Sequence, residues 1–212
     1  MISRRESFKL LSLLFMYGSQ SMASNVNYSP IQKNSFPIVK KIKVGKYNRD
    51  LTKLSNIRQA KKHIYLLKMY NPNTEEVLVS RFDKYKKIPK RELLKISYFL
   101  RDFHSGKVKE FDEKLIKYLA EVLEKTKRGK YIVVHSAYRT KYTNILLRER
   151  GYKTATKSMH IKAKAIDFHI SGFSAFNSYK IARKINPGGL GFYKDQKFIH
   201  MDTGKRRFWY SS

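Results

Sequence analysis

The 212-residue sequence contains no cysteine, which excludes disulfide bonds and thiolate metal sites. Any bound metal ion must therefore be held by His, Asp or Glu side chains. Acidic residues are also scarce, with 16 Asp and Glu against 46 Lys and Arg, which gives a formal net charge of +30. Such an excess attracts polyanions, and nucleic acid, an anionic membrane surface or a carboxylate-rich wall polymer fits it equally well. A solvated basic surface without any partner fits it too.

The apolar run at residues 10–17 is shorter than the roughly 20 residues that a membrane-spanning helix needs. It follows Arg4 and Arg5 in a segment that resembles a twin-arginine export signal. Small residues at Ser21 and Ala23 favour cleavage after Ala23. We therefore expect residues 1–23 to be a signal peptide and the protein to be exported to the periplasm or cell envelope. An uncleaved membrane anchor and a short amphipathic helix are the alternatives.

Residues 24–60 are basic and contain the breakers Pro30, Pro37 and Gly45, so we expect a weakly ordered arm. Its role is either that of a tether or that of a contact with an anionic surface. The rest of the chain, 61–212, is expected to be one folded domain. Overall 42% of the residues are hydrophobic and 14% are aromatic, which is more than a disordered chain would carry.

Hydrophobic periodicity predicts both strands and helices in this domain. Strands are expected at 63–70, 76–82, 131–134, 164–170, 190–193 and 197–201, the first two forming a hairpin. Helices are expected at 90–104, 111–127, 140–150 and 175–185. Helices dominate the first half and short strands the second, which indicates an α+β fold with a mostly antiparallel sheet.

Three residues could form a metal site in the second half of the chain. His160 lies in the loop before the 164–170 strand, Asp167 lies within that strand, and His200 lies near the C-terminus. Two imidazoles and a carboxylate suit a catalytic Zn²⁺ with an open fourth position. The alternative is that these are ordinary strand histidines with hydrogen-bond partners. Because side chains alternate along a strand, His169 shares a face with Asp167, and Asp202 shares one with His200.

Several motifs occur together in a family-specific order: Ser136-Ala137-Tyr138-Arg139-Thr140, Ser158-Met159-His160, Asp167-Phe168-His169, Gly188-Gly189-Leu190-Gly191-Phe192-Tyr193 and Phe198-Ile199-His200-Met201-Asp202-Thr203-Gly204. Their order and spacing resemble the YcbK-type murein endopeptidases, which are zinc D-Ala-D-Ala carboxypeptidase relatives with a hedgehog-like fold. The resemblance implies Zn²⁺ ligands at His160, Asp167 and His200. It also implies that Arg139 meets a carbonyl or carboxylate oxygen of the substrate, the peptidoglycan stem peptide.

The chain departs from the family pattern at two places. Ala163 stands where the family usually has glycine, and a positive φ there would strain the backbone. Lys197 and Phe198 occupy the positions from which relatives supply a general base, so His169 and Asp202 are the candidate bases. Alternatively Asp202 orients a zinc-binding histidine and His169 binds substrate.

Two other functions remain open beside the endopeptidase. The first is a non-catalytic, zinc-containing peptidoglycan-binding module, which the missing base favours. The second is a D,D- or L,D-carboxypeptidase that trims stem peptides. Nucleic-acid binding is disfavoured, because no recognisable motif accompanies the charge and the export signal argues against it. Electrostatic association with an anionic wall or membrane surface is the expected consequence of the charge.

Overall fold

The computed structural model describes residues 63–126, 130–152, 154–185 and 188–211, all of which belong to one compact unit. The expected signal peptide (1–23) and basic arm (24–60) lie outside the described residues. Within the described ranges, no helix is long and apolar enough to cross a membrane.

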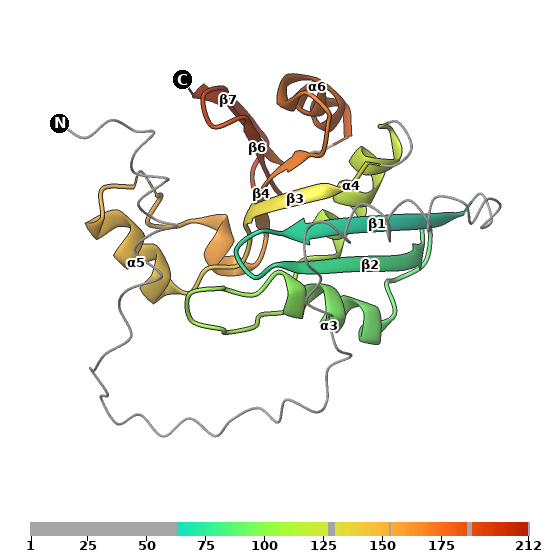
Figure 1. The fold of residues 1–212 in the computed structure, drawn as a ribbon, viewed down its shortest axis with the longest axis horizontal. Coiled ribbons are helices and arrows are strands. Elements are labelled where there is room, and N and C mark those ends of the chain that lie inside the picture. Colours follow the sequence, from blue (N-terminus) through green and yellow to red (C-terminus); the bar gives the residue numbers. More distant parts are fainter. Residues whose placement is uncertain (1–62, 127–129, 153, 186–187, 212) are drawn as a thin grey trace. The chain divides into compact units, whose positions relative to one another are not determined.

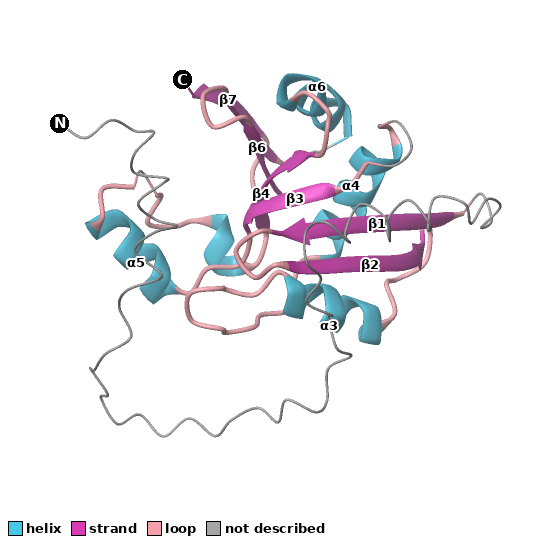
Figure 2. Ribbon diagram, in the orientation of Figure 1, coloured by secondary structure: helices cyan, strands magenta, loops and turns pink. Residues whose placement is uncertain are grey.

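A single seven-stranded sheet organises the described residues (Figures 1 and 2). Its spatial order is β2-β1-β3-β4-β6-β5-β7, and only the pairs β1/β3 and β5/β7 are parallel. The strands are β1 (Ile64–Asn71), β2 (Glu76–Asp83), β3 (Ile132–Ser136), β4 (Ala165–Ile170), β5 (Gly189–Tyr193), β6 (Phe198–Asp202) and β7 (Arg207–Ser211). The helices are α3 (Lys90–Phe99), α4 (Glu113–Glu124), α5 (Lys141–Glu149), α6 (Ala175–Ile185) and a 3₁₀ helix (Met159–Lys162). The predicted α+β class with a mostly antiparallel sheet is confirmed.

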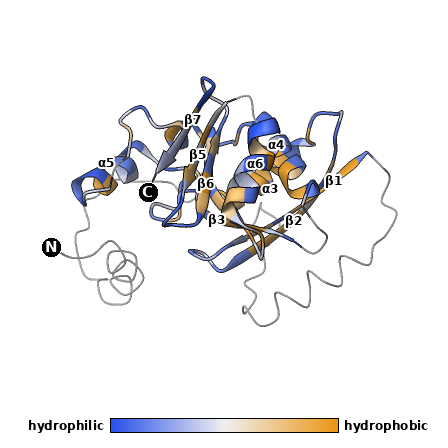
Figure 3. Ribbon diagram, turned by 90° about the horizontal axis from the view of Figure 1, so that it is seen from above, coloured by the Kyte–Doolittle hydropathy of each residue, from blue (hydrophilic) through white to orange (hydrophobic). Residues whose placement is uncertain are grey.

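Three helices pack on the sheet and form the core with it. α3 packs on β2, α4 on β1 and on α6, and α6 on β4, β5 and β6. Figure 3 shows these three helices grouped beside the strands. From β4, Ile166, Phe168 and Ile170 are fully buried in this core, as are Ile199 and Met201 from β6. Each such side chain contributes about 1.5–3 kcal/mol through burial, so this face of the sheet stabilises the fold.

The same alternation directs the polar residues of β4 and β6 to the opposite face. Asp167 and His169 follow this rule on β4, and His200 and Asp202 follow it on β6. Asp167 lies directly opposite His200 in the antiparallel pairing of these strands. The apolar core therefore fixes the register that brings two of the expected metal ligands together.

Two predicted helices extend beyond the observed ones by two or more residues at an end. The first ends at Phe99 rather than 104, because Asp102 turns the chain by accepting hydrogen bonds from the His104 and Ser105 amides. The second begins at Glu113 rather than 111, because the Asp112 side chain accepts from the Lys114 amide and caps it. Its predicted end, at 127, lies outside the described residues, and the observed helix ends at Glu124.

Candidate metal centre

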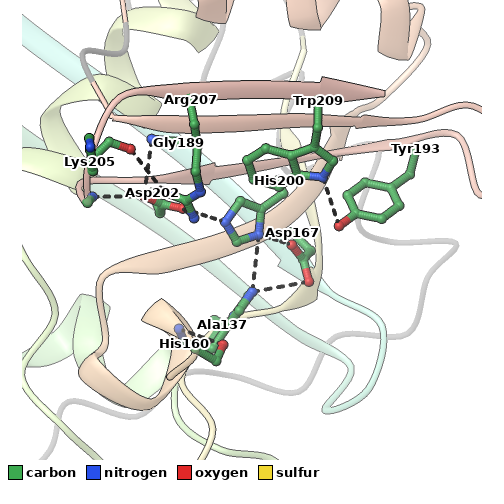
Figure 4. A network of polar contacts seen from close by, with 12 residues as sticks. Ala137, His160, Asp167, Gly189, Tyr193, His200, Asp202, Lys205, Arg207 and Trp209 are labelled. Atoms are coloured by element: carbon green, nitrogen blue, oxygen red, sulfur yellow. Dashed lines mark hydrogen bonds and ion pairs between the residues drawn. The ribbon is translucent and has the colours of Figure 1, made fainter. Parts of the chain in front are cut away.

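The three expected ligands meet at one point (Figure 4). One donor atom from each of His160, Asp167 and His200 lies within 4.8 Å of the other two. The Asp167 carboxylate is 2.8 Å from His200 Nδ1 and 3.3 Å from His160 Nε2. His160 Nε2 and His200 Nδ1 are themselves 3.3 Å apart. The 3₁₀ helix, β4 and β6 thus each supply one side chain to a compact cluster.

Hydrogen bonds on the outer side of each imidazole fix its tautomer. His160 Nδ1 lies 2.6 Å from the Ala137 carbonyl oxygen, which can only accept, so Nδ1 carries the proton. His200 Nε2 lies 2.8 Å from the Asp202 carboxylate and donates to it for the same reason. The lone pairs of His160 Nε2 and His200 Nδ1 therefore point inward, toward each other and toward Asp167.

Three acceptors that face one another at these distances repel unless a cation or a proton lies between them. The site offers two imidazole nitrogens and one carboxylate, and this donor set and its tautomers fit a divalent metal ion such as Zn²⁺. Burial alone would lower the pKa of His200, but its hydrogen bonds to Asp167 and Asp202 raise that pKa to about 9. Burial would likewise raise the pKa of Asp167, yet His160 and His200 hold it well below its usual range.

Asp202 is fully buried and holds His200 from behind. Besides His200 Nε2, its carboxylate accepts hydrogen bonds from the Gly189 amide at 3.1 Å, the Gly204 amide at 2.8 Å and Arg207 at 2.7 Å. Burial raises the pKa of Asp202, but these donors outweigh that effect and lower it. A permanently ionised carboxylate with all its contacts inside the protein suits the orienting role better than that of a base.

Arg139 lies beside the cluster in the loop between β3 and α5. The loop backbone is held by hydrogen bonds from the Arg139 amide to the His160 carbonyl and from the Thr140 amide to the buried Asp102 carboxylate. Burial lowers the pKa of Arg139, and the charges of Asp167 and Asp102 oppose that effect. The Arg139 Nε is buried and has no hydrogen-bond partner in the described part of the chain. A guanidinium held in this way can donate to an anionic group at the metal centre.

His169 lies on the same face of β4 as Asp167 but outside the metal cluster. Its Nδ1 is 2.7 Å from His135 Nε2, so one ring donates to the other. Burial lowers the pKa of both, that of His135 to about 4. The pair is therefore neutral near pH 7.

Tyr193 and Trp209 form a further part of the site. Trp209 Nε1 donates to the Tyr193 hydroxyl at 3.2 Å, and the Trp209 ring centroid is 5.2 Å from that of His200. The indole crosses Gly191, where a Cβ atom would come within 2.3 Å of it. The glycines at alternate positions of β5 are the sequence feature that could have indicated this arrangement, because large side chains from β7 lie across them. Burial raises the pKa of Tyr193, so its hydroxyl remains a donor.

A His–Asp–His donor set with an adjacent arginine, on the mostly antiparallel sheet of an α+β fold, fits a metallopeptidase of the hedgehog and D,D-peptidase fold group. The chain belongs to the family described as peptidoglycan L,D-endopeptidase MepK, whose model matches residues 59–209. The resemblance inferred from the sequence motifs is therefore confirmed.

Two relatives are similar over about two thirds of the chain. MepK of Escherichia coli K12 is 35% identical over 144 residues, which cover 68% of this chain and 79% of the relative. The probable MepK of Haemophilus influenzae is 34% identical over 145 residues, covering 68% and 78%. No solved structure gives a significant match.

Proposed function

We propose that the chain hydrolyses L,D-peptide cross-links of bacterial peptidoglycan, using Zn²⁺ held by His160, Asp167 and His200. The observation that carries this proposal is the set of three inward-facing acceptors, together with membership of a family named for this activity. When bound, Zn²⁺ would lower the pKa of a water molecule and polarise the scissile carbonyl. The activity places the protein's action at the cell envelope, and the 1–23 segment is the proposed export signal.

The residues around the proposed ligands would bind the substrate and stabilise the charge that develops during hydrolysis. Arg139 would donate to the oxyanion that develops at the scissile carbonyl or to a carboxylate of the stem peptide. The Tyr193 hydroxyl, whose oxygen accepts from Trp209, can donate its proton to a substrate oxygen.

Proton transfer needs a group that is neutral near pH 7 and close to the centre. His169 meets the first requirement, because burial lowers its pKa, and it lies two residues from Asp167 on the same face. We therefore retain His169 as the proposed general base. For Asp202 we propose the orienting role, because its carboxylate is already used by His200, two amides and Arg207.

The test is digestion of purified, cross-linked peptidoglycan by the full chain, with separation of the fragments by chromatography and mass spectrometry. We expect L,D-cross-linked dimers to be replaced by monomers. A chelator and His160→Ala should abolish this, whereas His63→Ala, at an exposed histidine, should not. Loss of only a terminal residue would identify a carboxypeptidase instead. A folded, Zn²⁺-loaded protein that cuts nothing would favour the binding module.

A further inference from the structure

A groove lies between α6 and β7, on the face of the sheet opposite the metal centre. Its volume is about 810 Å³, within the range of ligand pockets. β7 separates the two sites, because Arg207 and Trp209 point toward Asp202 and His200 while Phe208 and Tyr210 point toward α6. The groove lining consists of Phe173, Phe176, Asn177, Tyr179, Lys180, Ile181, Arg183, Lys184, Arg206, Phe208 and Tyr210.

The lining combines aromatic rings with four cations and contains no acidic residue. Arg183 and Arg206 both lie over the Phe208 ring, with guanidinium carbons 5.0 and 5.4 Å from its centroid. Lys180 lies over Phe176 in the same way, at 4.9 Å. In the described ranges, none of the four cations forms an ion pair with a carboxylate. Rings rather than acids therefore lie against three of these cations, and a guanidinium over a ring can still present N–H donors to an anion.

A buried hydroxyl adds a second, independent observation. Tyr179 is 1% exposed and lines the groove, and its hydroxyl interacts with the phenol of Tyr210, another lining residue. Burial and the neighbouring Tyr210 phenol raise its pKa to about 12, so it is a hydroxyl at any physiological pH. Two phenols that share one hydrogen bond use only one of their two O–H donors, so the other can donate to a ligand in the groove.

We propose that this groove binds a segment of the wall glycan together with free carboxylates of the stem peptides attached to it. Sugar rings present C–H faces that pack on aromatic rings, and the Tyr210 ring is exposed and has no cation over it among the described residues. Carboxylates match the paired donors of Arg183 and Arg206. This ligand rests on the proposed function, which makes the wall polymer the substrate. A glycan held on one side of β7 would keep its stem peptides near the metal centre on the other side.

The decisive comparison uses two double variants of equal charge in the full chain. Arg183→Gln/Arg206→Gln removes the stacked cations, and Arg81→Gln/Arg148→Gln removes two exposed arginines outside the groove. Binding to intact peptidoglycan sacculi is measured by co-sedimentation with a chelator present, so that no cleavage occurs. We expect the groove variant to bind about tenfold more weakly, because it loses charge-assisted hydrogen bonds, and the control to change less than twofold. Equal weakening in both, or none in either, would overturn the proposal.

Two further arms identify the ligand. Sacculi whose carboxylates have been converted to amides should bind the parent protein no better than untreated sacculi bind the groove variant. Vesicles containing anionic phospholipid, and single-stranded DNA, are tested alongside. If the groove variant loses binding to either of these but keeps binding to sacculi, the groove serves a membrane or a nucleic acid and the glycan assignment is wrong.

A cleavage arm separates this proposal from the proposed function. The groove variant should cut a short, sugar-free, L,D-cross-linked peptide as fast as the parent does but should cut intact sacculi more slowly. If the parent cuts neither substrate, the peptidase assignment fails, and the co-sedimentation result still decides the groove. If the groove variant is equally slow on both substrates, the groove acts through the fold and not through the glycan.

Discussion

Asp202→Asn is the substitution that most directly tests how the metal centre is held. The Asp202 carboxylate accepts from His200 Nε2 at 2.8 Å and from Arg207 at 2.7 Å. An asparagine can keep the bonds from the Gly189 and Gly204 amides with its oxygen, but its NH₂ group must then face other donors. His200 can relieve the conflict only by moving its proton from Nε2 to Nδ1, the atom that faces the other ligands.

That change of tautomer removes one metal-binding lone pair. Loss of such an orienting contact typically weakens metal binding by about 10–100-fold, or roughly 1.4–2.7 kcal/mol. We expect Asp202→Asn to lower Zn²⁺ affinity by this factor, measured by competition with a chelating dye at pH 7.5. The matched control is Asp195→Asn, which removes the same charge from an exposed position in the β5–β6 turn. A folded Asp202→Asn protein whose Zn²⁺ affinity is within twofold of the parent would refute the inferred tautomer.

Three other predictions follow from the geometry of the site and its surroundings. Arg139→Lys should lower kcat/KM on sacculi by about 10²–10³ while leaving the thermal midpoint unchanged, because lysine cannot present paired donors; an activity within threefold of the parent would contradict this role. Ala163 has φ +54° and is fully buried, so Ala163→Val should destabilise the protein by about 2–4 kcal/mol in urea unfolding, whereas Ala163→Gly should stay within about 1 kcal/mol. His135 has a folded-state pKa of about 4 against 6.5 unfolded, so its contribution to stability is complete above pH 6.5 and is lost as the pH falls toward 4. In the presence of a chelator, the free energy of unfolding of His135→Gln should therefore fall by about 2–3 kcal/mol less between pH 6.5 and 4 than that of the parent, as measured by urea unfolding. An equal fall in both proteins would contradict the lowered pKa of His135.

The candidate ligands were predictable because motif spacing and strand periodicity are local features of the sequence. Alternation places Asp167 and His169 on one face of β4, and His200 and Asp202 on one face of β6, without any knowledge of the fold. The pairing of β4 with β6 then brings the two faces together. Because the family usually has glycine at position 163, a positive φ could be expected there, and Ala163 does adopt one.

The rest of the site depends on contacts between segments that are distant in sequence. Nothing near Ala137 in the sequence shows that its carbonyl fixes the tautomer of His160, and nothing near Asp102 shows that it anchors the Arg139 loop. β7 was missed because it has only five residues, shows no alternation of apolar and polar side chains, and is defined as a strand by its pairing with β5. The four-residue 3₁₀ helix that carries His160 is too short to give a periodic signal.

The pairing of β7 with β5 also limits which sequence changes the metal centre and the groove can tolerate. Arg207 lies opposite Gly189 and Trp209 lies opposite Gly191, so each large side chain crosses a residue that has none. A slip of one position would turn Phe208 and Tyr210 toward the metal face and bring Trp209 into the groove, which would exchange the two sets of side chains. Side chains at 189 and 191 would force such a slip or expel the strand. The two glycines therefore fix the register of β7. An insertion or deletion in the 203–206 turn should disrupt the metal centre and the groove together.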